Sequence, residues 1–454
     1  MTTASGTLTT RHKYDVAIVG AGVCGAALAH VLRRYTNVGS IALVEKCSEA
    51  ASVNSASWNN SQTLHFGDIE TNYNLEKSRK VNRAATRVRR YLEVNDPEGE
   101  LHTRYHKMVL GVGEEECQRL EQRMESHRET FPDLELIERD RIAELEPALV
   151  EGRDPEQALK ALFSPDGYAV DYGKLARFFI KQAKQQDDEG SLDLYFDRKV
   201  ERIEPIQGGD GGYLLKVRNE KPIQARFLVA AAGGHSLLMA KQLGYGRHLG
   251  LLSVAGSFYE AERKLNGKVY TMQVKGLPFA APHGDPEVHE QGTTRFGPTA
   301  KPLPLLERRH YASFWDYWRT LGFGWNTMAS LLRILSRPII FRFADLNSLY
   351  EVPVLGKRLF LGKVRKIVPG LKPADIRRAR GYGGVRPQIV DTRDRDLDMG
   401  EAKIEGKNAR FVITPSPGAS VCLQSASEDA QAIADALGGD FSFDRDRFEA
   451  ELGA

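Results

Sequence analysis

The chain has 454 residues, of which 41% are hydrophobic and 27% are charged, so its composition fits two or three folded domains and excludes a disordered or fibrous protein. Lys and Arg exceed Asp and Glu by three, which is too small an excess for a general nucleic-acid binder, and we expect no nucleic-acid partner. The four cysteines lie far apart with no C-x-x-C pair, which predicts neither disulfides nor a metal site and favours a reducing, cytoplasmic location.

A strand–helix–strand unit is predicted after a Thr/Ser-rich flexible tail at residues 1–12. An apolar run at residues 14–19 predicts the first strand, and a helical pattern follows a glycine turn. The second apolar run, residues 41–44, ends at Glu45. The tail carries no apolar segment typical of a secretory signal, so none is expected.

The turn of this unit reads Gly20-x-Gly22-x-x-Gly25. In a dinucleotide-binding turn the first glycine permits a tight bend, the second lets the backbone approach a pyrophosphate, and the third lets the helix pack close to the strand. Glu45 follows Gly25 by 20 residues, where a carboxylate can accept the ribose hydroxyls. The alternative is a tight turn without a ligand. The motif alone does not separate NAD from FAD.

Further elements follow in chain order. Helical spacing predicts helices at residues 77–92 and 114–131, and we interpret the basic residues of the first as a solvated face. Alternation and turn signals predict strands at residues 200–206, 213–217 and 227–231, the last running into Gly233-Gly234. An apolar run at residues 411–414 precedes the turn 415–420 and a helical pattern to Leu437.

Several motifs resemble those of the FAD-dependent malate:quinone oxidoreductases, in the same order along most of the chain. They are Trp58-Asn59-Asn60, Thr63-Leu64-His65, Glu70-x-Asn72-Tyr73, Asp166-Gly167 with Val170-Asp171-Tyr172-Gly173, Pro282-His283-x-Asp285, Phe296-Gly297-Pro298 and Pro415-Ser416-Pro417-Gly418-Ala419-Ser420. The segment Gly384-Val385-Arg386-Pro387-Gln388 instead resembles L-2-hydroxyglutarate oxidase and D-amino-acid-oxidase relatives.

The resemblance implies an α/β fold of two domains, a Rossmann-like FAD domain and a substrate domain with a mainly antiparallel sheet. We expect the FAD domain to be discontinuous, over residues 13–80, 150–245 and 375–454. The substrate domain then takes residues 81–149 and 246–374. The cofactor contacts expected from the motifs are Gly20, Gly22, Gly25, Glu45, Ser55, Gly233, Pro417, Gly418 and Ser420.

The resemblance also implies FAD-dependent oxidation of a small 2-hydroxy carboxylate, malate-like, with electrons passed to a quinone or similar acceptor. Such a reaction needs a base for the hydroxyl proton, which a neutral histidine suits, and a cation for the carboxylate. In the amino-acid-oxidase relatives the arginine of this Arg-Pro motif binds the substrate carboxylate, so the resemblance implies that Arg386 is the carboxylate clamp; an arginine fork can hold a carboxylate in two parallel hydrogen bonds. The resemblance also implies His283 as the first candidate base, because both groups of relatives carry a histidine there. His65, in the loop expected near the flavin, is the second; a structural role stays open for all three.

Residues 307–342 combine six arginines and two acids with three of the four tryptophans. Aromatic and basic residues on an amphipathic element are typical of an anionic membrane surface, although a lid or subdomain core would use the same aromatics. We therefore expect either a peripheral segment on the cytoplasmic membrane face or an internal subdomain. No apolar run reaches the ~18 residues of a membrane span.

Two other functions stay open on the same fold. One is an amine or amino-acid oxidase, for which Arg386 would serve equally well. The other is a flavin-binding protein without catalysis. An NAD-dependent dehydrogenase is disfavoured, because nothing in the sequence resembles a separate nicotinamide site.

Overall fold

The computed structural model describes residues 12–186, 190–208, 211–273, 281–287, 292–322, 324–352, 354–398, 402–415 and 417–453. Apart from His12, the predicted tail lies outside these residues, and so does Ser416 of the C-terminal turn.

The first sheet brings both ends of the chain together. β1 (His12–Val19) lies at its centre, parallel to β2 (Ser40–Val44) on one side and β9 (Ile223–Ala230) on the other. The strand order is β19-β20-β9-β1-β2-β6, with β8 on β9 and β7 on β8. The bounds of the other strands are β6 (Ser191–Tyr195), β7 (Val200–Pro205), β8 (Tyr213–Val217), β19 (Ala402–Gly406) and β20 (Ala409–Ile413).

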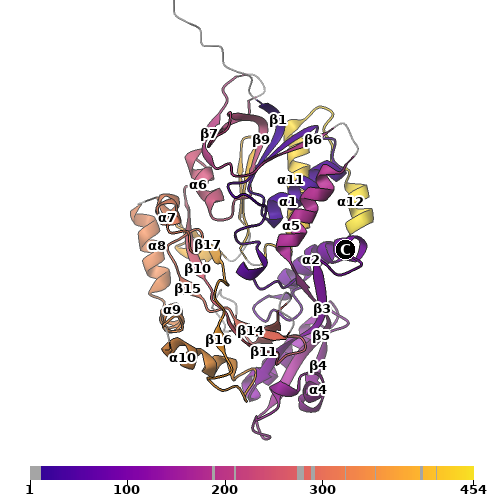
Figure 1. The fold of residues 1–454 in the computed structure, drawn as a ribbon, viewed down its shortest axis with the longest axis vertical. Helices are drawn as coiled ribbons and strands as arrows, with labels where there is room; N and C mark the ends of the chain where they lie inside the picture. The colour runs from indigo at the N-terminus through magenta and orange to yellow at the C-terminus, as the bar shows by residue number, and fades with distance from the viewer. Residues whose placement is uncertain are drawn as a thin grey trace, which may run out of the picture.

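Both faces of this sheet are covered, which explains why β1 reads as a continuous apolar run. Val16 and Ile18 face one core, and Ala17 and Val19 face the other. The first core contains three helices, of which the second and third both pack on the first, and two further helices lie outside them (Figure 1). These helices are α1 (Val23–Tyr35), α5 (Tyr172–Lys184) and α11 (Cys422–Leu437), then α2 (Leu75–Asn95) and α12 (Arg445–Leu452). α6 (His235–Gln242) lies on the opposite side with β7 and β8.

A second eight-stranded sheet and a third four-stranded sheet form the rest of the molecule. In the second sheet only β12 and β3 pair in parallel, so the expected mainly antiparallel sheet is confirmed. Its order is β16 (Arg377–Arg378), β11 (Tyr259–Glu262), β14 (Thr293–Gly297), β13 (His283–Pro286), β12 (Lys268–Thr271), β3 (His102–Val112), β5 (Leu159–Val170) and β4 (Glu135–Glu138). The third is β15 (Lys301–Pro302), β10 (Leu249–Ala255), β17 (Val385–Asp391) and β18 (Asp396–Asp398).

Four consecutive helices run along one edge of the molecule, in orange tones in Figure 1. They are α7 (Ser313–Leu321), α8 (Trp325–Leu335), α9 (Pro338–Leu349) and α10 (Leu355–Val364). Tyr317, Leu331 and Ile340 are among the side chains that they bury in the core behind the first and third sheets. The remaining helices are α3 (Glu114–His127), α4 (Arg139–Leu145), and the short 3₁₀ turns η1 (Ser57–Asn59) and η2 (Pro147–Leu149).

The pairing of strands does not follow the expected domain boundaries everywhere. β5 comes from the range assigned to the FAD domain but pairs with β3 and β4 of the second sheet. β17 also comes from that range and pairs with β10. α2 crosses the boundary at residue 80 and packs on α11 and α12. The division into two domains by residue range therefore stays a prediction.

Candidate functional site

The glycine turn after β1 forms a cradle in which side chains do not fit. Gly20 has φ +105°, and a Cβ there would lie 2.6 Å from the carbonyl oxygen of Ala231 at the end of β9. A Cβ on Gly25 would collide with the carbonyl oxygen of Gly20, so this glycine lets α1 approach the strand. A Cβ on Gly22 would lie 3.3 Å from the hydroxyl of Ser55. Backbone contacts thus explain the glycines at positions 20 and 25, and the Ser55 hydroxyl limits the space at position 22.

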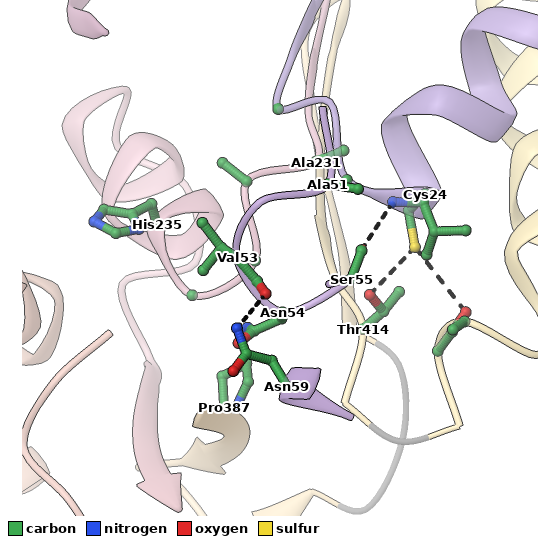
Figure 2. Close-up of a pocket in the computed structure, with 18 of the residues that line it drawn as sticks. Cys24, Ala51, Val53, Asn54, Ser55, Asn59, Ala231, His235, Pro387 and Thr414 are labelled. Atoms are coloured by element: carbon green, nitrogen blue, oxygen red, sulfur yellow. Dashed lines mark hydrogen bonds between the residues drawn. The ribbon is translucent and has the colours of Figure 1, made fainter. Parts of the chain in front are cut away.

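Ser55 and Glu45 satisfy backbone groups around this cradle. The Ser55 hydroxyl accepts a hydrogen bond from the Val23 N–H (3.0 Å), at the first residue of α1 (Figure 2). One oxygen of Glu45 accepts from the Ala21 N–H (2.8 Å) and the other from the Cys47 N–H (2.9 Å). Each carboxylate oxygen keeps a second lone pair, so Glu45 can still accept hydroxyl groups of a ligand.

A cavity of about 260 Å³ opens above the cradle; it is the larger of two that adjoin here, and we call it the large cavity. Eight of the nine expected cofactor contacts line it, and Gly25 does not; the eight are Gly20, Gly22, Glu45, Ser55, Gly233, Pro417, Gly418 and Ser420. Segments from four parts of the chain therefore meet at one cavity. Figure 2 shows two of its ties: Asn59 donates to the carbonyl of Val53 (2.8 Å), and the Cys24 thiol lies 3.5 Å from the Thr414 hydroxyl.

The C-terminal turn is joined to the loop before α2. The Ser420 hydroxyl accepts from the His65 N–H (2.9 Å) and donates to the carbonyl of Thr63 (3.4 Å). Ser420 does not cap α11, because the residue at the N-cap is Val421 and makes no side-chain cap. The serine thus fixes the position of the 63–65 loop against the large cavity.

A smaller cavity of about 90 Å³ adjoins the large one. Four residues line both cavities: Ser61, His65, Arg386 and Pro415. His283, like Tyr270 and Gln388, lines the small cavity but not the large one. The structure therefore brings all three candidate catalytic residues to the small cavity, and it places Arg386 and His65 at the junction.

His65 is held by a buried carboxylate. Its Nδ1 lies 2.6 Å from Glu70 Oε1. Burial alone would raise the pKa of Glu70, but the hydrogen bond from His65 and the positive charges of Lys107 and Arg123 lower it to about 2. Because an ionised Glu70 accepts a proton-bearing Nδ1, a neutral His65 has its lone pair at Nε2.

Arg386 is a cation without an acidic partner in the described part of the chain. It lies on β17 opposite Val254 of β10, and no carboxylate lies within ion-pair distance of it among the residues that the structure describes. Burial lowers the pKa of the guanidinium, and Tyr270 acts in the opposite direction. An arginine stays protonated in proteins, so an uncompensated positive charge stands between the two cavities.

His283 has a different environment. It is 2% exposed, its ring lies 4.7 Å from that of Tyr270, and its Nε2 is 3.5 Å from Asp285. Burial lowers the pKa of His283 to about 3 despite this carboxylate, so the ring is neutral at physiological pH. Asp285 also accepts a hydrogen bond from Arg295 (2.9 Å), which ties β13 to β14.

Two residues beneath the 61–65 loop were not singled out from the sequence. The Tyr270 hydroxyl lies 2.7 Å from the Thr63 hydroxyl, and Lys268 donates to the Thr63 hydroxyl (3.1 Å) and the Ser61 carbonyl (3.2 Å). Burial lowers the pKa of Lys268 to about 8. The sequence carried no local signal for them, since β12 is short and lies about 200 residues from the loop that it supports.

Two further findings concern the described residues only. No three of their His, Cys, Asp or Glu side chains gather as ligands of a metal would, and all four cysteines are free thiols. None of the helices in the described ranges combines the length and apolarity that crossing a bilayer requires.

Comparison with known proteins defines the class of this site. The family model "FAD dependent oxidoreductase" matches residues 15–419. L-α-glycerophosphate oxidase from Mycoplasma pneumoniae, solved with FAD, superposes with a TM-score of 0.65 at 17% identity, over 95% of this chain and 96% of that one. Glycine oxidase from Geobacillus kaustophilus gives a TM-score of 0.63 at 17% identity, over 95% and 97%. The protein is an FAD-dependent oxidoreductase, and the glycine cradle and the large cavity fit this cofactor.

Curated relatives define the family more narrowly. The chain is 38% identical to a probable malate:quinone oxidoreductase from Campylobacter jejuni over 452 residues, covering 97% of this chain and 99% of that protein. It is also 38% identical to the malate:quinone oxidoreductase of Helicobacter pylori over 447 residues, covering 97% and 98%. The chain belongs to the malate:quinone oxidoreductase family.

Proposed function

We propose that this protein oxidises malate to the corresponding 2-oxo acid and passes the electrons to a quinone. The observation that carries the proposal is the junction of the two cavities, where a carboxylate anchor, Arg386, and a proton acceptor, His65, both face the small cavity and the large one. The 38% identity to malate:quinone oxidoreductases over nearly the whole chain supports malate as the substrate.

Arg386 binds a carboxylate of the substrate. Its guanidinium can donate two parallel hydrogen bonds, which fix the orientation of a carboxylate as well as its position. The negative charge of the substrate also compensates the charge that the fold leaves unpaired. The free energy of carboxylate binding is therefore more favourable here than at an arginine that already has an acidic partner.

His65 takes the hydroxyl proton of the substrate at Nε2. Glu70 holds the ring through Nδ1 and stabilises the imidazolium that forms, as the carboxylate of a catalytic triad does. We favour His65 over His283 for two reasons. His283 lines only the small cavity, and its low pKa makes it a weak base. His283 and Tyr270 then form the wall against which the substrate packs.

The large cavity holds FAD. Gly20, Gly22 and the N-terminal end of α1 would hold the pyrophosphate, Glu45 would accept ribose hydroxyls, and the 417–420 turn would contact the flavin. When bound, FAD accepts the hydride from the carbinol carbon and returns the electrons to an acceptor.

Steady-state assays on the purified holoenzyme test the substrate, with a soluble dye as the electron acceptor. L-malate should give the highest kcat/KM in a panel with L-2-hydroxyglutarate and D- and L-amino acids. A higher kcat/KM for an amino acid would identify an amino-acid oxidase instead, and no turnover with any compound would indicate a flavin-binding protein without this activity.

We further propose that the protein docks on the cytoplasmic face of a membrane through α7 to α10. All large hydrophobic side chains that the described chain exposes lie between residues 311 and 355, except Trp58 and Val94. We call the following residues the α7–α10 apolar surface: Tyr311, Trp315, Trp325, Leu332, Ile339, Phe341, Leu349, Val352, Val354 and Leu355. Trp325 is 91% exposed and Val354 72%.

The inner sides of these helices are already buried, so this surface is a second, outward-facing apolar side. Exposed arginines accompany it, at positions 319, 333 and 342. Aromatic and aliphatic side chains rimmed by arginine suit the headgroup layer of an anionic bilayer. A bilayer is also where a hydrophobic quinone is found, which supports quinone as the acceptor.

A further inference from the structure

A third cavity, of about 460 Å³, lies beside the α7–α10 apolar surface and belongs to neither of the cavities described above. Five cationic side chains line it, and we call it the cationic pocket. They are Arg308, Arg309, Lys357, Arg378 and Arg380. They come from the segment before α7, from α10 and from the segment around β16, so the fold gathers them from distant parts of the chain.

The pocket has one acidic lining residue, Glu351, and its carboxylate is already paired with cations. Glu351 forms ion pairs with Arg378 and, at 3.5 Å, with Lys301. Burial opposes its ionisation, but the Ser257 hydroxyl and these cations together lower its pKa. Arg309, Lys357 and Arg380 have no acidic partner within the described ranges, and Arg309 donates to the carbonyl of Tyr382 (3.0 Å).

The deepest of the five cations is ordered by the backbone. Arg308 donates to the Gly256 carbonyl and, at 2.5 Å, to the Ser257 hydroxyl. Burial lowers its pKa, Glu351 acts in the opposite direction, and the charges of Arg309 and Arg378 lower it further. The pocket therefore gathers cations that repel one another, and an anion that entered it would relieve the repulsion.

The rim of the pocket is apolar on one side. Val352 and Val354 line the pocket and also belong to the α7–α10 apolar surface, where Leu355 follows them at the start of α10. A ligand in the pocket can thus have a phosphate among the arginines and hydrocarbon against the valines. An anionic phospholipid carries both groups, a phosphate and hydrocarbon chains beside it.

We propose that the cationic pocket binds the phosphate of an anionic phospholipid headgroup when the α7–α10 apolar surface lies on a bilayer. The inference rests on the membrane docking proposed above and adds a specific site to it. Arginine forks match phosphate oxygens in two parallel bonds, so the pocket should prefer phosphate over a carboxylate of equal charge. One bound headgroup would then fix the orientation in which the protein docks.

Vesicle co-sedimentation of the holoenzyme tests this proposal. Phosphatidylcholine vesicles carry either phosphatidylglycerol or cholesteryl hemisuccinate, at pH 8 and equal surface charge, so that only the chemistry of the anion differs. The pocket variant is Lys357→Gln/Arg380→Gln, and the matched control is Arg319→Gln/Arg333→Gln, which removes two cations of α7 and α8 outside the pocket. Malate oxidation with a soluble dye should be unchanged in both variants.

The wild type should bind the phosphatidylglycerol vesicles more tightly than the carboxylate vesicles. The pocket variant should lose this preference, with binding to phosphatidylglycerol weakened about tenfold or more, since each cation near the surface contributes measurably. The control should weaken binding to both vesicles equally and keep the preference. Equal losses in the two variants without a change of preference would show diffuse attraction and overturn the headgroup site alone.

Inorganic phosphate distinguishes the two sources of the anion. Saturable binding of free phosphate that is lost in the pocket variant, with vesicle binding and anion preference the same in both proteins, would identify a site for free phosphate and contradict the lipid. Vesicle binding that depends on the apolar surface but not on the anion would leave docking intact and overturn the headgroup site. No vesicle binding by the wild type would overturn both.

Discussion

At the scale of single residues, the unusual feature of the site is the unpaired charge of Arg386. Arg386 is half-buried, and holding a cation partly away from water without an acid costs stability. The fold leaves Arg386 in this state at the junction of two cavities, which is explained if the compensating carboxylate arrives with the substrate.

Replacing Arg386 by Ala should therefore impair substrate use without weakening the fold. We expect kcat/KM for malate to fall about 30-fold or more. This corresponds to a loss of about 2–5 kcal/mol of transition-state stabilisation. FAD should stay bound, and the Tm should not decrease, because no ion pair is lost. The matched control is Arg377→Ala, which removes an exposed arginine paired with Glu260 on β11. Equal kcat/KM in the wild type and in Arg386→Ala would exclude the clamp.

Glu70 should make stability depend on pH in a defined direction. Its folded pKa of about 2 lies below the usual 4.5, so the fold favours the ionised form. This contribution is complete above about pH 4.5 and is lost as the pH falls towards 2. Denaturant unfolding across this range should show the wild type losing more stability than Glu70→Gln. Parallel curves for the two proteins would contradict the buried pair with His65.

At the scale of elements, the β1–α1 turn depends on space as well as on backbone angle. Gly20→Ala would place a side chain at a positive φ and also in collision with Ala231. Gly113→Ala, at the N-cap of α3, would place one at a φ of +88° with no atom within 4 Å. Both variants should lose some stability from the angle. Only Gly20→Ala should release FAD, as measured by the flavin absorbance retained on purification. Equal retention in the two variants would argue against the cradle.

The outward sides of α8 and α9 should determine membrane binding. Burying a side chain of this size in hydrocarbon gains about 1.5–3 kcal/mol, so Trp325→Ser and Phe341→Ser should each weaken binding to anionic vesicles about tenfold or more. Val94→Ser on α2, also exposed, is the control and should bind as the wild type does. Trp318 is a poor probe because it packs partly against the core. Unchanged co-sedimentation of the double variant Trp325→Ser/Phe341→Ser with vesicles would contradict docking through the α7–α10 apolar surface.

At the scale of the whole molecule, the parts predicted well from the sequence are those whose signals are local. The strand–turn–helix at residues 14–35 carries its apolar run and its glycines in one segment, and the antiparallel pair β7–β8 carries its turn residues between two strands. The structure confirms both. The α/β fold with a mainly antiparallel second sheet is likewise confirmed.

What the sequence could not provide is which distant segments meet. Nothing near Thr63 indicates that Tyr270 and Lys268 support it from β12, since that contact forms only when the second sheet is assembled. His65 and Glu70 are only five residues apart in the sequence. Their proposed role nevertheless depends on the two cavities that His65 lines, and these are formed by distant segments. The expected membrane segment ended at residue 342, whereas the exposed apolar side chains continue to Leu355, because α9 and α10 complete the same surface.

The most direct test of the proposed activity is anaerobic titration of the purified holoenzyme with L-malate, followed by addition of a quinone, with the visible flavin absorbance as the readout. Malate should bleach the flavin stoichiometrically, and the quinone should restore the absorbance without oxygen. A flavin that malate leaves oxidised, in a preparation that retains its FAD, would contradict the proposal.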